Sequence, residues 1–334
     1  MRTLPATPPP APIPAASPQQ PGTQGIYGGQ PKAFLRPGGF SLYQGEAVPQ
    51  QQRVRRLALI FLLDHVRGWW VRVQMAGFLL PAIGFAIYVL VRANLPSAAL
   101  TVPKAERMAH ILQNLRWSFS IDLGFLLLFA ASRLAPLITR DANAGALLLY
   151  FSRPLQRDHY LVARLAATGT LAFALLAVPQ TLLLLVQMGV FGLDIGSSAG
   201  SALGIWLYLL LGTLLSSAFA AAAVALSALA AGVLVRAPST VPLVYGGGIL
   251  ASLVASWVTQ AAWGRDSLGR ALDLHNALGG LQRLMAESSQ WAQYPDFAWH
   301  IDLLGSGLWL ALGAASTAIL LKYLKNPPLG RGRA

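Results

Sequence analysis

Long apolar stretches alternate with short polar ones from about residue 73 to the end of the chain. The hydrocarbon core of a bilayer is about 30 Å thick, so a helix needs about 20 mostly apolar residues to cross it. Six windows meet this length: 73–91, 117–138, 161–190, 202–235, 241–262 and 301–324. The pattern therefore predicts an all-α, polytopic membrane protein with six transmembrane helices.

Lysine and arginine gather in every second polar stretch. These residues are Arg53, Arg55, Arg56, Arg140, Arg153, Arg157, Arg164, Arg236, Lys322, Lys325, Arg331 and Arg333. With six crossings they all lie on one side, which the positive-inside tendency assigns to the cytoplasm. The stretch 191–200 contains Asp194 and no Lys or Arg, while 94–116 and 263–300 mix both signs. We therefore expect both termini in the cytoplasm.

The segments outside the spans differ in character. Residues 1–50 are rich in Pro, Gln and Gly and too poor in apolar surface to offset the entropy of ordering, so they predict a disordered cytoplasmic tail. Residues 53–72 combine arginines with Leu, Ile and Trp, which favours an interfacial helix before the first span. Residues 265–297 predict outer amphipathic helices. The domain order is then a tail (1–50), a six-helix transmembrane domain (51–325) and a short basic cytoplasmic tail (326–334).

Composition supports a chain dissolved mainly in lipid. Of 334 residues, 55% are hydrophobic and 11% are charged, whereas soluble domains carry about a quarter charged residues. The formal net charge is +13, but the basic residues border apolar windows, which favours membrane lipids with anionic headgroups over nucleic acid as counter-charges. The chain has no cysteine, which excludes disulfides, thiolate metal sites and a cysteine nucleophile.

The stretch between the second and third windows carries the most specific pattern. Asp141 stands at its start, followed by the apolar run Leu147, Leu148, Leu149 and by Ser152-Arg153-Pro154. The residue before a proline is pushed towards extended geometry, so a break is expected at Arg153, with Pro154 opening the next helix. An exposed leucine ridge between arginines suits a docking element for a soluble partner. A loop bound to lipid headgroups fits the same residues.

This stretch resembles the cytoplasmic coupling segment of type-2 ABC transporter permeases. An acidic residue, a glycine, a leucine-rich run, Ser-Arg-Pro and a further arginine precede the third span in that family. The matching residues are Asp141, Gly145, Leu147, Leu148, Leu149, Ser152, Arg153, Pro154 and Arg157. Many members carry Glu where this chain has Asp141, and the likeness extends by topology over about residues 53–325.

The resemblance implies the transmembrane permease subunit of an ABC exporter in a bacterial cytoplasmic (inner) membrane. Two permease copies, as a homodimer or heterodimer, would each dock on a separate ATPase subunit. This chain has no Gly-x-x-x-x-Gly-Lys-Ser/Thr phosphate loop, so it is not expected to be an enzyme. ATP and Mg²⁺ would bind to the partner subunit, and this chain would hold no cofactor of its own.

Two charged residues fall inside the second window. Asp122 and Arg133 are eleven positions apart, too far along a helix for a direct pair, although they can share a face. Charges in a span usually face the protein interior or water, so both are candidates for a translocation path. A structural role, with Asp122 hydrated near the outer boundary, is the other interpretation. No two histidines have metal-binding helical spacing, so no metal site is expected.

Two other function classes remain open from the sequence. An intramembrane lipid-modifying enzyme would need acidic or histidine side chains clustered at one depth, for which only Asp122 and Asp302 offer candidates. A membrane anchor or scaffold of a larger envelope complex would use the Pro-rich tail as a tether. The sequence does not identify a transported substrate.

Overall fold

The computed structural model describes residues 49–94, 104–144, 157–192, 199–235, 237–263 and 299–325. Within those ranges every regular element is a helix, which confirms the all-α prediction for this part of the chain. The elements are α1 (Gln50–Arg67), α2 (Trp69–Gly77), α3 (Leu79–Asn94), α4 (Lys104–Phe129), the π-helix η1 (Ala130–Leu134), α5 (Leu137–Asn143), α7 (Arg157–Phe191), α8 (Ala199–Leu234), α9 (Val241–Trp263) and α12 (Trp299–Lys325). Of the tail expected at 1–50, residues 1–48 lie outside the described residues, as do the tail expected at 326–334 and the amphipathic helices expected at 265–297.

Five helical stretches are long and apolar enough to cross a membrane. They are Val71–Arg92, His110–Asn143, Asp158–Phe191, Ala202–Leu234 and Val241–Ala262. Each one overlaps one of the first five windows expected from the sequence. The sixth window falls on α12, whose apolar part is the shorter stretch Gly307–Lys322. The described structure therefore supports a multi-pass membrane protein with five candidate spans.

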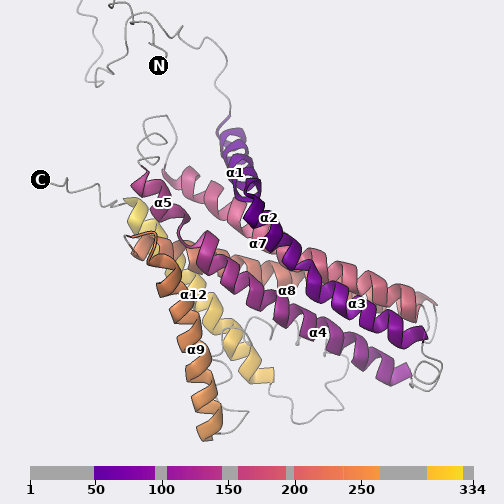
Figure 1. Ribbon diagram of the computed structural model, residues 1–334. Helices are drawn as coiled ribbons and strands as arrows, with labels where there is room; N and C mark the ends of the chain where they lie inside the picture. Colours follow the sequence, from indigo (N-terminus) through magenta and orange to yellow (C-terminus); the bar gives the residue numbers. More distant parts are fainter. Residues whose placement is uncertain are drawn as a thin grey trace, which may run out of the picture. The chain divides into compact units, whose positions relative to one another are not determined.

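Helix α7 makes the most extensive contacts with the other described helices. It lies along α8 over much of its length and also contacts α1, α3 and α4, as Figure 1 shows, while α12 packs on α8. The largest buried cluster joins Phe119, Leu123 and Leu126 of α4 to Leu176 of α7 and Val224 of α8. Leucine and aromatic side chains fill this core, and alanines on α8 let the helices approach closely.

Helices α3 and α9 bury little of their apolar surface within the chain. Exposed apolar side chains on them include Leu80, Ile83, Ile87, Leu243, Leu250, Val254 and Trp257. A soluble protein rarely leaves so much contiguous apolar surface uncovered. Lipid tails, or other apolar protein surface within the bilayer, suit these faces.

The second span is interrupted before its end. The amide of Ala135 donates to the carbonyl of Ala130 at 2.8 Å, a hydrogen bond across five residues that marks η1 as a π-helical turn. Pro136 follows directly, and α5 starts at Leu137. A proline has no backbone N–H to donate, so the helix is interrupted at a position where the regular backbone hydrogen bonds of an α-helix already lack a donor.

Helix α8 approaches this break very closely at Gly232. A Cβ atom placed on Gly232 would lie 2.1 Å from the carbonyl oxygen of Ala135. The hydroxyl of Thr139 donates to the carbonyl oxygen of Gly232 and lies 3.3 Å from that of Val235. The end of α8 is thus held against the start of α5 by contacts that need a residue without a side chain at position 232.

Gly232→Ala is expected to destabilise the protein by about 1–3 kcal/mol, because the added methyl group must displace backbone rather than a flexible side chain. Gly204→Ala on the same helix is the matched control, since nothing lies within 4 Å of a Cβ there. Thermal unfolding of the purified protein in lipid nanodiscs measures both. Equal midpoints for the two variants would contradict the close approach.

Candidate functional site

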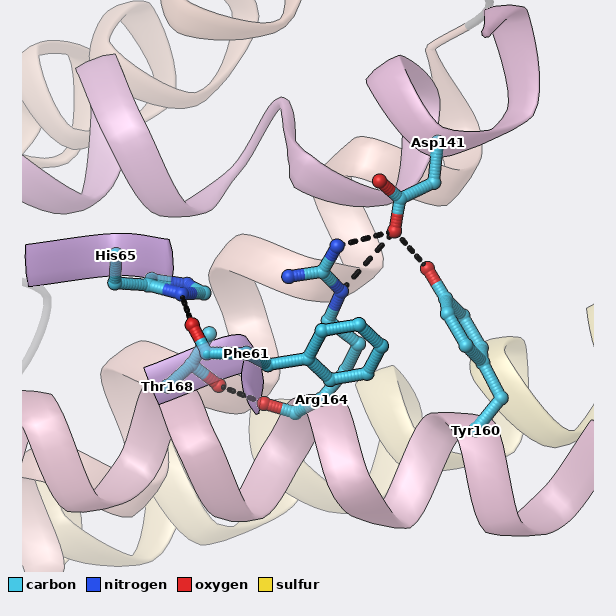
Figure 2. A network of polar contacts seen from close by, with 6 residues as sticks. All are labelled: Phe61, His65, Asp141, Tyr160, Arg164 and Thr168. Atoms are coloured by element: carbon cyan, nitrogen blue, oxygen red, sulfur yellow. Dashed lines mark hydrogen bonds and ion pairs between the residues drawn. The ribbon is translucent and has the colours of Figure 1, made fainter. Parts of the chain in front are cut away.

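An ion pair joins the two helices on either side of the stretch 145–156. Asp141 lies in the last turn of α5, and Arg164 lies in the second turn of α7. The Nε atom of Arg164 donates to Oδ2 of Asp141 at 3.1 Å, and Nη2 donates to the same oxygen (Figure 2). The Arg164 side chain is only 4% exposed and that of Asp141 is 17% exposed. Such a buried pair fixes both helices, because neither charge is stable there without the other.

Two aromatic rings enclose this ion pair. The hydroxyl of Tyr160, one turn before Arg164 on α7, donates to the same Asp141 oxygen (Figure 2). The guanidinium carbon of Arg164 lies 3.7 Å from the centre of the Phe61 ring, which comes from α1. The Phe61 and Tyr160 rings meet edge to face, with centroids 5.7 Å apart. We call Phe61, Asp141, Tyr160 and Arg164 the Arg164 cluster.

The Arg164 cluster ties α1, α5 and α7 together at one point. Only arginine combines a planar face for stacking on Phe61 with several fixed donors for a carboxylate. The ring of Phe61 reaches the guanidinium because α1 packs along the start of α7. The ion pair therefore links α5 to α7, and the stacked ring links α7 to α1.

His65 stands one turn after Phe61 on α1. Its Nδ1 atom makes a hydrogen bond with the carbonyl oxygen of Phe61 (Figure 2). Burial lowers the pKa of His65 below its ordinary value of 6.5, and the positive charge of Arg164 adds to that effect. The Phe61 carbonyl, Asp64 and Asp141 act in the opposite direction but do not outweigh burial. His65 is therefore held neutral beside the Arg164 cluster.

The structure describes only part of the segment that the sequence singled out. Asp141 is in the Arg164 cluster, and Arg157 is the first residue of α7. The other matched residues lie outside the described part: Gly145, Leu147, Leu148, Leu149, Ser152, Arg153 and Pro154. Sequence reasoning used Arg164 only as a basic flank and missed Phe61, Tyr160 and His65. The sequence feature that could have indicated this cluster is an arginine within an otherwise apolar helix, four positions after a tyrosine.

A second polar site lies within the spans. Asp122 on α4 is fully buried, and its Oδ2 atom accepts a hydrogen bond from Nε2 of Gln180 on α7 at 2.8 Å. The same nitrogen lies 2.9 Å from the hydroxyl oxygen of Ser118, one turn before Asp122. The hydrated boundary position considered from the sequence does not fit this burial. Arg133 lies in η1, partly exposed, and no polar contact joins it to Asp122 within the described residues.

Further buried polar side chains accompany Asp122. Asn114, Ser118 and Asp122 follow one another every fourth position on α4, so they share one face. The others are Gln180 and Gln187 on α7 and Thr213, Ser216 and Ser217 on α8. In the sequence these residues are isolated polar positions within apolar windows. Their burial could not be predicted from that pattern. In the described residues no three His, Asp or Glu side chains gather as a metal site would need.

Comparison of the sequence with protein-family models and with curated proteins finds no match.

Asp141→Ala should destabilise the protein by about 3 kcal/mol, because it leaves the guanidinium of Arg164 buried without a counter-charge. Asp141→Ala combined with Arg164→Met should cost less than the sum of the two single changes, since the unpaired charge is then absent. A double-mutant cycle on unfolding midpoints in nanodiscs measures this coupling. Arg92→Met, which removes an exposed hydrogen bond to Tyr88, is the control. Additive costs for positions 141 and 164 would show that the pair does not couple the helices.

Acid pH should loosen α1. A histidine whose pKa is lowered in the folded protein takes up its proton more readily when released, so stability falls as the pH drops below 6.5. Backbone hydrogen exchange in α1 should therefore rise between pH 7 and pH 5.5, and less so in His65→Gln. Comparing the two proteins at each pH cancels the intrinsic pH dependence of exchange. The same rise in both would rule out His65 as its cause.

Proposed function

We propose that this chain is the transmembrane permease subunit of an ABC exporter, coupling ATP hydrolysis by a separate ATPase subunit to substrate translocation. The proposal is supported by the apolar helices long enough to cross a membrane and by the likeness of residues 141–157 to a coupling segment. Neither feature identifies a substrate. The geometry of the Arg164 cluster supplies the third and most specific support.

The geometry of the Arg164 cluster suits a structure that transmits force from residues 145–156 to the transmembrane helices. The described residues stop at 144, just after α5, and resume at Arg157, the first residue of α7. The ion pair between Asp141 and Arg164 bridges these two ends, so the segment has a rigid base. The observation that carries the proposal is this buried bridge, because a flexible surface loop has no need for one. Force on the segment would then turn α7, which contacts α1, α3, α4 and α8.

In this arrangement the basic stretches face the cytoplasm and α12 makes the sixth crossing, so both termini are cytoplasmic. Helix α1 lies at the inner membrane surface, with exposed arginines at 55 and 56 near lipid headgroups and exposed Leu59, Ile60 and Leu63 towards the acyl chains. The uncovered faces of α3 and α9 meet lipid or the second permease copy. ATP and Mg²⁺ bind to the partner ATPase.

Replacing Leu147, Leu148 and Leu149 together with aspartate should abolish co-purification of the ATPase, because the docking ridge would lose its apolar surface and gain charge. The test is affinity purification of the tagged full-length chain from its native membrane, with bound ATPase measured by mass spectrometry and by ATP hydrolysis. The matched control places three aspartates at Ala11, Ala15 and Ala16 in the Pro-rich stretch. That control should keep the ATPase.

An ATPase retained by the variant with aspartates at 147–149 would refute docking at this ridge. Failure of the wild-type chain to carry any ATPase would refute the permease proposal itself. Asp141→Ala separates ATPase docking from coupling between the ATPase and the helices. This variant should keep the bound ATPase, because the leucine run is unchanged. The permease should stimulate ATP hydrolysis less, because the ion pair at the base of the segment is lost.

A further inference from the structure

Two buried oxygen atoms near the middle of the second and third spans have no hydrogen-bond partner. They are Oδ1 of Asp122 and Oε1 of Gln180. Both side chains are fully buried, and their other polar atoms already meet, since Nε2 of Gln180 donates to Oδ2 of Asp122 at 2.8 Å. Buried polar atoms without partners are uncommon in folded proteins, so this pair of orphan oxygens requires an explanation.

A single proton resolves both orphan atoms. A carboxylic acid and a primary amide are complementary: the amide N–H donates to one carboxyl oxygen while the acid O–H donates to the amide oxygen. The first of these two hydrogen bonds is present. The second would form between Oδ1, once it carries a hydrogen, and the Gln180 amide oxygen, and these are the two atoms of the pair that lack a partner. We propose that Asp122 is a proton-binding site, at which a neutral carboxylic acid is held by Gln180 through two hydrogen bonds.

The surroundings of Asp122 favour a neutral group. No Lys, Arg or His side chain pairs with it among the described residues. On the helices packed around it, Arg116 stands six positions before it, Arg133 eleven after it, and Arg164 sixteen positions before Gln180; these separations are about 9, 16 and 24 Å along the axes. On α3, Arg92 donates to the Tyr88 hydroxyl. An ionised carboxylate without a counter-charge is costly in a span, and protonation removes that cost.

A bound metal cation fits this site less well. Hard cations need several oxygen ligands, and the pair of Asp122 and Gln180 offers two oxygens without a partner, Oδ1 and Oε1. Gln187 also has unpartnered polar atoms, but it lies seven positions beyond Gln180, about 10 Å further along α7. A proton requires no further ligand. Proton binding at Asp122 requires the burial of this side chain and is independent of ATPase docking.

Infrared spectroscopy of the full-length protein in lipid nanodiscs at pH 7 tests the proton directly. A protonated carboxyl shows a C=O stretch well separated from those of carboxylates and amides. The wild-type protein should show this band, and Asp122→Asn should lose it. Asp64→Asn, at an exposed acid on α1, is the matched control and should leave the band unchanged. Gln180→Leu should keep the acid band but shift it, because the hydrogen bonds to the acid are lost.

Stability supplies an independent readout. Asparagine at position 122 is neutral and makes the same two hydrogen bonds to Gln180, so Asp122→Asn should unfold within about 2 °C of wild type. Gln180→Leu should lower the midpoint clearly. A wild-type protein without an acid band at pH 7, or with a band that Asp122→Asn leaves in place, would overturn the proposal. Loss of the band on adding Na⁺ at constant pH would instead identify a cation site and would equally refute a resident proton.

Discussion

Inside a bilayer no water is present to satisfy a polar group, so each one must find its partner within the protein. For the backbone this requirement produces helices, and every described element of this chain is one. For side chains it produces pairs that hold specific helices together. Arg164 and Asp141 join α7 to α5, and Gln180 and Asp122 join α7 to α4. Both pairs include α7, which makes the most extensive contacts with the other described helices.

The two polar sites differ because their chemical needs differ. The guanidinium of Arg164 remains charged at any accessible pH, so it needs a carboxylate and gains from stacking on Phe61. The polar neighbours of Asp122 among the described residues are the amide of Gln180 and the hydroxyl of Ser118, and Asp122 can become neutral by taking up a proton. The Asp141–Arg164 site therefore holds a permanent ion pair next to the candidate docking segment. The proposed proton at Asp122 leaves the second site without a net charge.

The elements that follow from apolar length alone could be predicted well. The window 241–262 coincides with the span Val241–Ala262, and 161–190 differs from Asp158–Phe191 by only a few residues. The window 117–138 was too short, since the span His110–Asn143 includes Asn114 and Thr139, polar residues that turn inward. Pattern analysis counts such residues against a span. It cannot tell that neighbouring helices cover them.

The pairs of polar residues that join the helices could not be predicted from the sequence. Arg164 and Asp141 are 23 positions apart, and Gln180 and Asp122 are 58 apart, so no periodicity relates them. Gly232 looks like any small residue in an alanine-rich helix until the carbonyl of Ala135 is placed against it. The leucine ridge at 147–149 and the proline turn after it lie outside the described residues, and their docking role is still a prediction.

The proposed permease arrangement requires residues 145–156 to face the cytoplasm, across the membrane from the stretch that follows α7. The chain has no cysteine, so single substitutions Gly145→Cys, Asp194→Cys and Asn326→Cys give unambiguous labelling by a membrane-impermeant maleimide. Cysteines at 145 and 326 should react only from the cytoplasmic side, and a cysteine at 194 should react only from outside. Labelling of positions 145 and 194 from the same side would contradict this arrangement.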